Sequence, residues 1–510
     1  MNGSGPISLG KLLRASGLGT PPVADGITVG GLACDSRKVR SGDLFFALAG
    51  SVTNGAEFLR QAASAGAVAA VVQDGASAGA SSGTGFLPLI GVPDAREAMA
   101  RIASAYHGNP SGSLSVAGVT GTNGKTTTAW IIRHLCDTVG RRCGLIGTIR
   151  HILPGREEEA NRTTPESLEL QTLLTEMRDG GFKAAAIEVS SHALVQHRAT
   201  GINFDAAVFT NLSQDHLDYH GTMEEYFRAK SLLFTGLAGQ AAKKGRAVVN
   251  SDDRYGRRLL DILPASVPVI TYGQGSNCAF RASAIRPGAE GTVFRLDAKG
   301  RSYLVRTPLI GLHNVLNTVA ALAAVSAMGL ELRRAVAAAA SIPQIPGRLQ
   351  RVPVRRGFQC FVDYAHTPDA ISGVLKSVRA IGAGRIITVF GCGGERDRAK
   401  RPLMAAAAEQ GSDHVILTSD NPRGEDPAAI LRETAAGFRS KSHEIVADRE
   451  EAIRRAVELA RTGDIVLIAG KGHETYQDIS GARHPFDDVR VAASAMGRLE
   501  SGARGEEAVR

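Results

Sequence analysis

The chain is predicted to be an α/β protein of three domains, and three observations lead to this fold class. Its 510 residues are about three times the usual domain length of roughly 150 residues. Hydrophobic residues make up 43% and charged residues 21%, which is enough apolar content for several cores. From residue 114 onward, apolar runs end in Gly-rich or polar turns and alternate with helical stretches, the pattern of a largely parallel sheet covered by helices.

The composition excludes several classes of protein. A chain with this apolar content does not remain disordered. Its 59 glycines follow no fixed period, which excludes collagen-like order. The net charge of +9 is spread without a block of five basic residues. This charge fits a solvated surface, and it fits anionic small ligands as readily as nucleic acid.

Cysteine usage and hydropathy indicate a cytoplasmic protein. The six cysteines form no C-x-x-C pair, so they predict no disulfide framework, zinc site or redox motif. The first residues contain no sustained apolar segment. The most apolar helical stretch, Val319–Leu330, is interrupted by Ser and Gly and is too short to cross a bilayer. We therefore expect neither export nor membrane insertion.

The chain divides into three segments, residues 1–111, 112–345 and 346–510. The first mixes short apolar runs, Asp43–Leu48 and Ala67–Gln73, with a low-complexity loop at residues 75–85. Strands predicted in the second are Leu114–Val119, Ala184–Val189, Ala206–Thr210 and Ala247–Asn250. Those predicted in the third are Cys360–Val362, Arg385–Phe390, His414–Thr418 and Asp464–Ala469. The carboxyl ends of such strands are where ligands bind in open α/β sheets.

The strongest motif is Gly118-Val-Thr-Gly-Thr-Asn-Gly-Lys-Thr126, which follows a strand and precedes the helical run Thr127–Leu135. Glycines in such a loop let backbone N–H groups approach phosphate oxygens at a helix N-terminus. Lys125 would reach the β- and γ-phosphates, and the Thr126 hydroxyl would bind Mg²⁺. The motif departs from the strict phosphate loop, which has Gly where this chain has Val119. The strand–loop–helix context still favours a nucleotide site.

Glu188 and His216 have two interpretations each, and Lys230 taken alone has one. Glu188 ends an apolar strand, where a carboxylate can hold Mg²⁺ or form a salt bridge. His216 follows another strand in Thr210-Asn-Leu-Ser-Gln-Asp-His216 and is either a metal ligand or a structural histidine. Lys230, taken alone, is typical of a surface helix.

Taken in order, these motifs resemble those of the Mur ligases, ATP-dependent amide-forming enzymes of peptidoglycan precursor synthesis. The resemblance covers essentially the whole chain and includes Gly311-Leu-His-Asn-Val-Leu-Asn317, Pro346-Gly-Arg-Leu-Gln350 and Val362-Asp-Tyr-Ala-His-Thr-Pro368. Three more motifs are similar to the branch of the family that adds 2,6-diaminopimelate: Gly391-Cys-Gly-Gly-Glu-Arg-Asp397, Asp420-Asn-Pro-Arg423 and Gly470-Lys-Gly-His-Glu474.

The resemblance implies a reaction and a role for each domain. The α/β domain of residues 1–111 would bind UDP, the P-loop ATPase domain of residues 112–345 would bind ATP on a mostly parallel sheet, and the Rossmann-like domain of residues 346–510 would bind the amino acid. The γ-phosphoryl group of ATP would pass to the D-glutamate of UDP-N-acetylmuramoyl-L-alanyl-D-glutamate, and meso-2,6-diaminopimelate would displace phosphate from the acyl-phosphate. We expect a monomer that needs Mg²⁺ and binds no nucleic acid.

The same resemblance implies the nucleotide and metal residues. ATP would be bound by Gly121, Thr122, Asn123, Gly124, Lys125, Thr126, Thr127, Asn314 and Asn317. One Mg²⁺ would lie beside Thr126 and Glu188, and a second beside His216 and Lys230, which is carbamylated in this family. Carbamylation turns a repelling ammonium into an anionic oxygen ligand that suits a hard cation. The catalytic group would be Lys125, Glu188, His216, Lys230, Arg348 and Asp363, with Lys125 and Arg348 supplying positive charge where two anions meet.

Substrate residues follow from the motifs in the same way. UDP contacts are expected at Cys34, Ser36, Ser51, Val52 and Thr53. The muramoyl-dipeptide would be held by Thr163, Thr164, Ser190, Gln196 and Arg198. Arg162 stands where Asn often precedes the Thr pair in the family.

The acceptor amino acid would bind in the C-terminal domain. Lysine and meso-diaminopimelate differ by one distal carboxylate, and arginine binds a carboxylate through two parallel N–H···O bonds. Arg423 is the candidate for this contact, with Arg396 as a second guanidinium. Asp420 and Glu474 would receive the ammonium groups. The family motifs add Asn421, Pro422 and Gly470 to this site.

Three alternatives stay open at this point. A lysine-adding relative would lack the arginine of the Asp-Asn-Pro-Arg motif, which is present here. Folylpolyglutamate synthase shares the P-loop and the central fold but lacks this N-terminal segment and the C-terminal motif set. A regulatory or nucleic-acid-binding P-loop ATPase would carry clustered basic residues, whereas Lys and Arg are interspersed with Asp and Glu here.

Overall fold

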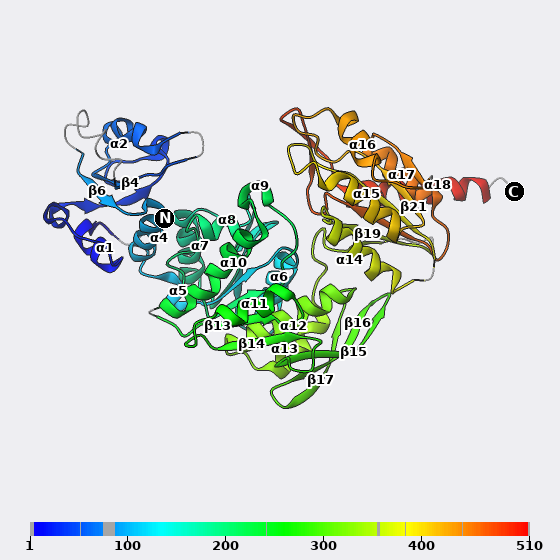
Figure 1. Cartoon of the computed structure of the whole chain (residues 1–510), viewed down its shortest axis with the longest axis horizontal. Coiled ribbons are helices and arrows are strands. Elements are labelled where there is room, and N and C mark those ends of the chain that lie inside the picture. The colour runs from blue at the N-terminus through cyan, green and yellow to red at the C-terminus, as the bar shows by residue number, and fades with distance from the viewer. Residues whose placement is uncertain are drawn as a thin grey trace.

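The computed structural model describes residues 5–50, 53–74, 87–240, 242–353, 357–382, 384–440 and 442–507, with side chains to residue 497. Three sheets of four or more strands follow one another along the described chain, each with its own helices and core, and β1-β2 and β24-β25 form two small sheets besides. Figure 1 shows the N-terminal and C-terminal parts rising from the same side of the central part and lying apart from each other. The central part therefore connects the other two.

The N-terminal part contains a parallel sheet of four strands in the order β3-β4-β5-β6. Alternate residues of β4 point to opposite faces, so Leu44 and Phe46 join one core and Phe45 and Ala47 the other. Asp94 begins α4 by accepting hydrogen bonds from the N–H groups of residues 96 and 97. The elements are β1 (Ile7–Ser8), α1 (Leu9–Ala15), β2 (Thr28–Val29), β3 (Gly31–Ala33), β4 (Asp43–Ala47), α2 (Leu59–Ser64), β5 (Ala69–Gln73), β6 (Leu89–Val92) and α4 (Ala95–Tyr106).

The central part is built on a sheet of eleven strands in the order β10-β9-β8-β11-β7-β12-β13-β14-β15-β16-β17. The strands from β8 to β15 in this order pair in parallel, and antiparallel hairpins extend the sheet at both edges. The strands are β7 (Ser115–Thr120), β8 (Cys143–Ile146), β9 (Arg150–Leu153), β10 (Arg156–Glu159), β11 (Ala184–Glu188), β12 (Ala206–Phe209), β13 (Arg246–Asn250), β14 (Val269–Gly273), β15 (Phe280–Gly288), β16 (Gly291–Ala298) and β17 (Arg301–Thr307).

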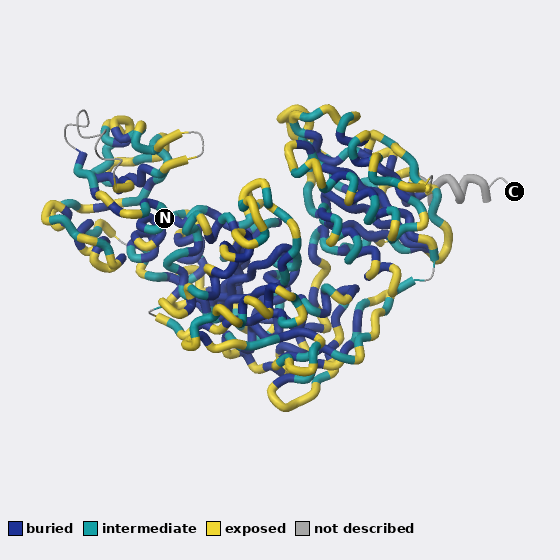
Figure 2. Tube along the Cα trace, viewed as in Figure 1, coloured by how far each residue is buried: buried dark blue, intermediate teal, exposed yellow. Residues whose placement is uncertain are grey.

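Helices cover both faces of the central sheet, as an apolar parallel sheet requires. One core contains residues of α6, α12 and α13, and the other contains residues of α7, α10 and α11 (Figure 2). The helices are α5 (Pro110–Ser113), α6 (Lys125–Thr138), α7 (Ser167–Asp179), α8 (Ser191–Val195), α9 (Leu217–His220), α10 (Met223–Thr235), α11 (Arg254–Ile262), α12 (Leu312–Ala327) and α13 (Leu332–Ala338). The apolar stretch Val319–Leu330 lies mostly in α12. Among the described helices, none has both the length and the apolar character that crossing a bilayer requires.

The C-terminal part has a sheet of six strands in the order β18-β19-β23-β20-β21-β22, parallel except for β18. Helices α14, α15 and α16 pack on one face, and α17 and α18 pack on the other. The elements are β18 (Gln350–Val352), β19 (Gln359–Asp363), α14 (Pro368–Arg379), β20 (Ile386–Phe390), α15 (Lys400–Gly411), β21 (His414–Leu417), α16 (Pro427–Ala435), β22 (His443–Ile445), α17 (Arg449–Leu459), β23 (Ile465–Ala469), β24 (Tyr476–Ile479), β25 (Ala482–Pro485) and α18 (Asp488–Glu507).

The predicted α/β fold class is confirmed, and the eight predicted strands lie within two residues of β7, β11, β12, β13, β19, β20, β21 and β23. The two short apolar runs of the first segment form β4 and β5. The antiparallel edge from β15 to β17 was not predicted. Its residues alternate between buried and exposed, as in Gly291–Ala298, so they form no continuous apolar run. The six cysteines are free thiols, as expected.

Candidate active site

A glycine-rich loop, residues 121–124, joins the end of β7 to the start of α6. Gly121 and Gly124 have φ angles of 145° and 86°, which L side chains rarely adopt. A Cβ atom at Gly121 would lie 1.9 Å from the Thr210 hydroxyl oxygen, and one at Gly124 would lie 2.4 Å from Asn317 Oδ1. Both positions therefore require glycine. The loop brings backbone to the N-terminus of a 14-residue helix, which favours a bound phosphate.

Lys125, the first residue of α6, folds back over this loop. Its Nζ donates hydrogen bonds of 2.9 Å to the backbone oxygens of Gly121 and Thr122. The backbone N–H of Asn123 donates to Oδ1 of Asn211 at 3.0 Å. Burial lowers the pKa of Lys125, and the Glu188 carboxylate opposes that shift. The ammonium group is thus held where phosphate oxygens can replace the loop carbonyls as its acceptors.

A cavity of about 400 Å³ opens at this loop and is lined from the central and the C-terminal parts. It gathers most residues predicted for ATP and catalysis: Thr122, Asn123, Gly124, Lys125, Thr126, Thr127, His216, Asn314, Asn317, Arg348 and Asp363. Thr163, predicted for the muramoyl-dipeptide, lines it too. The two asparagines contact each other, since Asn317 Nδ2 donates to Asn314 Oδ1 at 3.1 Å. The sequence pattern therefore identified residues that lie together in space.

Glu188, at the end of β11, is fully buried beneath the cavity wall. Its Oε2 accepts a hydrogen bond from Thr126 Oγ1 at 2.8 Å. Its remaining acceptor contacts are with Thr148, and it forms no ion pair with a described residue. A buried carboxylate beside a hydroxyl oxygen, without a cationic partner, is a donor set that suits Mg²⁺.

Lys230 of α10 is 1% exposed, which contradicts the surface-lysine interpretation. Its Nζ donates to the backbone oxygen of Gly121 at 3.0 Å. Burial lowers the pKa of Lys230 well below its usual value, and the charge of Lys125 lowers it further. Its amine is therefore favoured in the neutral form, the form that reacts with carbon dioxide.

His216 lies at the start of α9 with a φ of 54°. Its Nε2 is 3.4 Å from Asp215 Oδ2, and its ring centroid is 5.0 Å from that of His192. Burial lowers the pKa of His216 to about 4, although Asp215 opposes the shift, so the imidazole is neutral at physiological pH. Within the described part of the chain, no three His, Cys, Asp or Glu side chains are arranged as a metal-binding group.

Arg348 and Asp363 reach the cavity from the C-terminal side. Arg348 Nη2 donates to Thr126 Oγ1 at 3.2 Å, and its guanidinium carbon lies 4.5 Å from the ring centre of Tyr364. Asp363 Oδ2 accepts a hydrogen bond of 2.6 Å from the backbone N–H of Leu349. Burial raises the pKa of Asp363 to about 6, and Arg348 opposes the shift. The Arg348 hydrogen bond connects the C-terminal part directly to the first turn of α6, next to the glycine-rich loop.

Four of the five residues predicted for the muramoyl-dipeptide form one hydrogen-bonded group. The hydroxyl of Thr164 donates to the backbone oxygen of Glu188 at 2.8 Å and accepts from the backbone N–H of Ser190 at 3.1 Å. Arg198 donates to the Thr164 backbone oxygen at 3.0 Å and to Gln196 Oε1 at 2.6 Å. This group therefore lies directly beside Glu188.

Residues predicted for UDP lie in the N-terminal part. Cys34 is half-buried, Thr53 is exposed, and Ser36 Oγ donates to Gln61 Oε1 at 2.8 Å. Ser51 and Val52 lie outside the described residues. Of the three described residues, Cys34 has its pKa raised by burial and, to a smaller extent, by the Glu166 carboxylate, which therefore lies close to it.

The carboxylate of Glu166 forms ion pairs with three arginines of the N-terminal and central parts. Its carboxylate lies 2.6 Å from Arg162, 3.0 Å from Arg198 and 3.8 Å from Arg96 of α4. Arg162 therefore pairs with a carboxylate here. Three guanidinium groups around one carboxylate leave net positive charge, which suits an anionic substrate.

A C-terminal loop cluster, residues 391–397, 419–425 and 470–474, lies at the carboxyl ends of β20, β21 and β23 and holds the residues predicted for diaminopimelate. Asn421 Nδ2 donates to Glu474 Oε2 at 2.7 Å, and Arg423 Nη1 donates to the backbone oxygen of Gly394 at 2.7 Å. At Gly470, where φ is 115°, a Cβ atom would lie 2.6 Å from Asp420 Oδ2. Pro422 lies within the same loops, and Arg396 lies close enough to Tyr364 to affect its pKa.

The sequence analysis missed some residues of these sites. Lys471 is fully buried, and its Nζ contacts Asn421 Oδ1 at 2.9 Å and Glu474 Oε2 at 3.2 Å. Its place inside the Gly470–Glu474 motif was a signal that could have found it. Thr148 lies two residues after β8, a strand that the sequence analysis did not predict.

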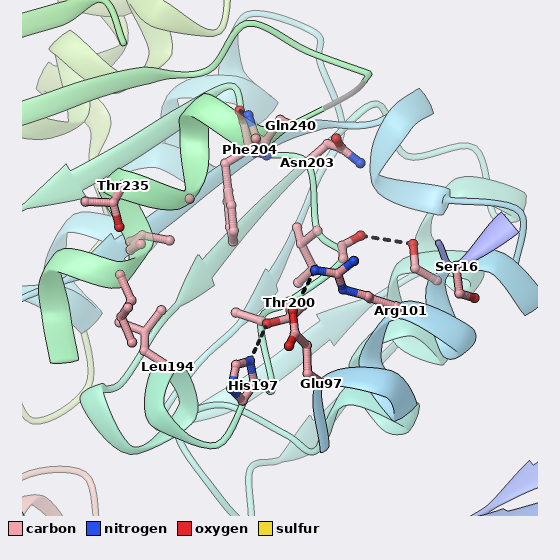
Figure 3. Close-up of a pocket in the computed structure, with 18 of the residues that line it drawn as sticks. Ser16, Glu97, Arg101, Leu194, His197, Thr200, Asn203, Phe204, Thr235 and Gln240 are labelled. Atoms are coloured by element: carbon pink, nitrogen blue, oxygen red, sulfur yellow. Dashed lines mark hydrogen bonds and ion pairs between the residues drawn. The ribbon is translucent and has the colours of Figure 1, made fainter. Parts of the chain in front are cut away.

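A second cavity, of about 600 Å³, lies at the boundary of the N-terminal and central parts (Figure 3). Its polar side chains contact one another: Arg101 pairs with Glu97 at 2.6 Å, and His197 Nδ1 lies 3.2 Å from the Thr200 hydroxyl. None of the predicted site residues lines it.

Three family models match the chain in order along its length. Residues 28–107 match the model described as Mur ligase family, catalytic domain. Residues 119–325 match the Mur ligase middle domain, and residues 347–472 match the Mur ligase, glutamate ligase domain.

Individual proteins are similar over almost the full length. UDP-N-acetylmuramoyl-L-alanyl-D-glutamate–2,6-diaminopimelate ligase of Geobacillus kaustophilus is 46% identical over 469 residues, 91% of this chain and 94% of that protein. The ligase of the same name from Streptomyces avermitilis is 44% identical and covers 96% of each chain. A solved structure of a ligase with this name matches with a TM-score of 0.70 and 35% identity, over 97% of this chain and 99% of that one. The chain belongs to the Mur ligase family.

Proposed function

We propose that this chain is the ATP-dependent ligase that adds meso-2,6-diaminopimelate to the D-glutamate of UDP-N-acetylmuramoyl-L-alanyl-D-glutamate in peptidoglycan precursor synthesis. The observation that carries the proposal is the position of Tyr364. Arg348 of the nucleotide cavity lies on its ring, and Glu474, Asp420 and Arg396 of the C-terminal loop cluster are near enough to affect its pKa. The ATP site and the proposed amino-acid site are therefore neighbours.

The reaction joins two carboxylate-bearing substrates through phosphoryl transfer. The D-glutamate γ-carboxylate attacks the γ-phosphorus of ATP, which releases ADP and gives an acyl-phosphate. The diaminopimelate amine then attacks the acyl carbon, the C–O bond to phosphate breaks, and an amide forms. Lys125 and Arg348 reduce the repulsion between the carboxylate and the phosphates, because both cations lie at the cavity.

Magnesium is expected to assist by neutralising phosphate charge. Glu188 and the Thr126 hydroxyl would hold one ion, which is supported by the buried, unpaired carboxylate of Glu188. His216 and Lys230 would hold another. The lowered pKa values of both side chains support a neutral imidazole and a neutral amine that can be carbamylated.

Other contacts are proposed from the same placement. The hydrogen-bonded group of Thr164, Ser190, Gln196 and Arg198, with Thr163, would hold the muramoyl-dipeptide. Arg423 would bind the distal carboxylate of diaminopimelate, and Glu474 would bind its ammonium group. We also propose domain boundaries at residues 111 and 345, a cytoplasmic monomer, and no binding of nucleic acid.

The test compares phosphate release with diaminopimelate and with lysine, each in the presence of ATP and the UDP-dipeptide. Rapid release with diaminopimelate only is the expected result. Equal rates would contradict the amino-acid specificity and leave the lysine-adding activity as the alternative. Release that needs nucleic acid and not the UDP-dipeptide would contradict the ligase proposal.

A further inference from the structure

The buried carboxylate of Glu188 is held by Thr148, which lies two residues after β8. The backbone N–H of Thr148 donates to Glu188 Oε1 at 2.8 Å, and its hydroxyl donates to Oε2 at 3.0 Å. The preceding residue, Gly147, lies close to the same carboxylate, since a Cβ atom there would be 2.2 Å from Glu188 Oε1. A turn with these three contacts determines the orientation of the carboxylate.

Thr148 also contacts the substrate side of the cavity. Its hydroxyl oxygen lies 3.1 Å from that of Thr163, and both residues line the 400 Å³ cavity. No other described residue is hydrogen-bonded to both Glu188 Oε2 and Thr163. Thr148 is therefore the link between the carboxylate under the phosphate loop and the proposed dipeptide site.

The proton directions along this link follow from the groups involved. An ionised carboxylate only accepts hydrogen bonds, and a hydroxyl has one proton to donate. Since Thr148 donates its proton to Glu188, it must accept from Thr163. On the other side, Thr126 donates to Glu188 and accepts from Arg348. The donors therefore converge on Glu188 from both sides.

We propose that Thr148 is a positioning residue that couples occupancy of the dipeptide site to the nucleotide site through Glu188. This inference rests on the proposed function. An anionic substrate oxygen that accepts the Thr163 proton removes the donor to Thr148. The Thr148 hydroxyl then changes its hydrogen bonding to Glu188, so substrate binding alters the group beside the phosphates. Such coupling must be reciprocal, because it is a free energy shared by two binding events.

The experiment measures the Kd of a non-hydrolysable ATP analogue, with Mg²⁺ present, in the absence and presence of saturating UDP-dipeptide. In the wild type the dipeptide should change this Kd by at least about fivefold. In Thr148→Val, which keeps the backbone N–H and the shape, the change should fall below about twofold. Thr148→Ser restores the hydroxyl and should behave as the wild type. Thr175→Val is the matched control, because that hydroxyl bonds only within α7.

A second variant tests the link from its other end. Thr163→Val should abolish the same coupling while leaving Thr148 bonded to Glu188, and the double variant should show no further loss. A wild type without coupling, or a Thr148→Val variant with the full effect, would overturn the inference. Failure of the proposed function is distinguishable, because the wild type would then show no turnover that depends on the UDP-dipeptide.

Discussion

The nucleotide cavity and the C-terminal loop cluster lie at the carboxyl ends of parallel strands in successive sheets, yet they are held in shape differently. At the phosphate loop, Gly121 and Gly124 allow close backbone contact, and the cation Lys125 bonds only to loop carbonyls. Because the glycines and the contact between Asn123 N–H and Asn211 also hold the loop, we expect it to keep its shape when Lys125 is replaced.

The C-terminal loop cluster depends on buried charge instead. Arg401 of α15 is fully buried and donates both Nη groups to Glu425 at 2.9 and 3.0 Å, while Nη1 also contacts Glu433 at 2.6 Å. Its Nη2 reaches the backbone oxygen of Gly393 at 3.2 Å, so it joins two loops of the cluster. Removing Arg401 would therefore take from Glu425 and Glu433 a fully buried cation that both contact.

A second buried pair supports the cluster from the other face of the sheet. Arg449 and Asp488 are both fully buried and lie 2.7 Å apart. Arg449 also donates to the backbone oxygens of Ser419 and Ala469, where β21 and β23 end. From this comparison we expect Lys125 in the nucleotide cavity to affect turnover. We expect Arg401 and Arg449, which are buried under the loop cluster, to affect the stability of the fold.

The largest expected effect is on turnover in Lys125→Ala. Losing a cation that neutralises transferring phosphate should lower kcat at least about 100-fold, while the melting temperature stays that of the wild type. Steady-state kinetics and thermal denaturation measure the two effects. Lys244→Ala, an exposed lysine of the same part, is the control. A large drop in the melting temperature of Lys125→Ala would show that Lys125 also stabilises the fold, and would contradict the difference drawn between the two regions.

Arg401→Met should reduce the stability of the C-terminal part rather than act directly on turnover. Glu425 and Glu433 would lose the fully buried cation that both contact, which should clearly lower the free energy of unfolding of the C-terminal part. Urea denaturation measures this loss. Arg398→Met is a matched control, because Arg398 also contacts Glu433 but is 62% exposed, and it should lower the free energy of unfolding much less than Arg401→Met. Equal losses in the two variants would contradict the role given to burial.

Arg423→Ala tests substrate binding in the loop cluster, whereas Arg401→Met tests the stability of its loops. It should raise the KM for meso-diaminopimelate at least about tenfold, because a bidentate bond to a charged group contributes about 1.5–3 kcal/mol per bond. The KM for ATP should not change, and lysine should remain a poor substrate, since no lysine pocket is created. Arg432→Ala, exposed in the same part, is the control. Unchanged diaminopimelate kinetics would indicate that Arg396, and not Arg423, binds the distal carboxylate.

The smallest effect is a pH dependence of stability from Asp363, whose pKa is raised to about 6 by burial. A raised folded-state pKa stabilises the protein below the unfolded-state pKa near 4, and this stabilisation is lost as the pH rises through 6. Between pH 5 and 7 the wild type should therefore lose about 1 kcal/mol relative to Asp363→Asn. Denaturant unfolding at both pH values measures the difference, with Asp369→Asn as the exposed control. Parallel pH profiles would show that Asp363 is not shifted.

Much of the fold and the nucleotide site could be predicted, because both depend on local patterns. Apolar strands followed by turns gave the parallel strands, and the glycine spacing gave the phosphate loop next to α6. The antiparallel strands β15 to β17 were missed, because an exposed face interrupts their apolar runs. Binding roles of the individual site residues stay predictions until the experiments above are done.

By itself, the sequence determined the family, the order of the three parts, and the residue types at the carboxyl ends of the strands. Only the tertiary structure decided that Lys230 is buried, that Thr148 joins Glu188 to Thr163, and that Arg401 supports the loops from beneath. The physical reason is that burial and hydrogen-bond partners depend on segments far apart in the chain, such as Lys230 and Gly121. The type of a residue in one sequence does not identify the residue that it contacts in the folded protein.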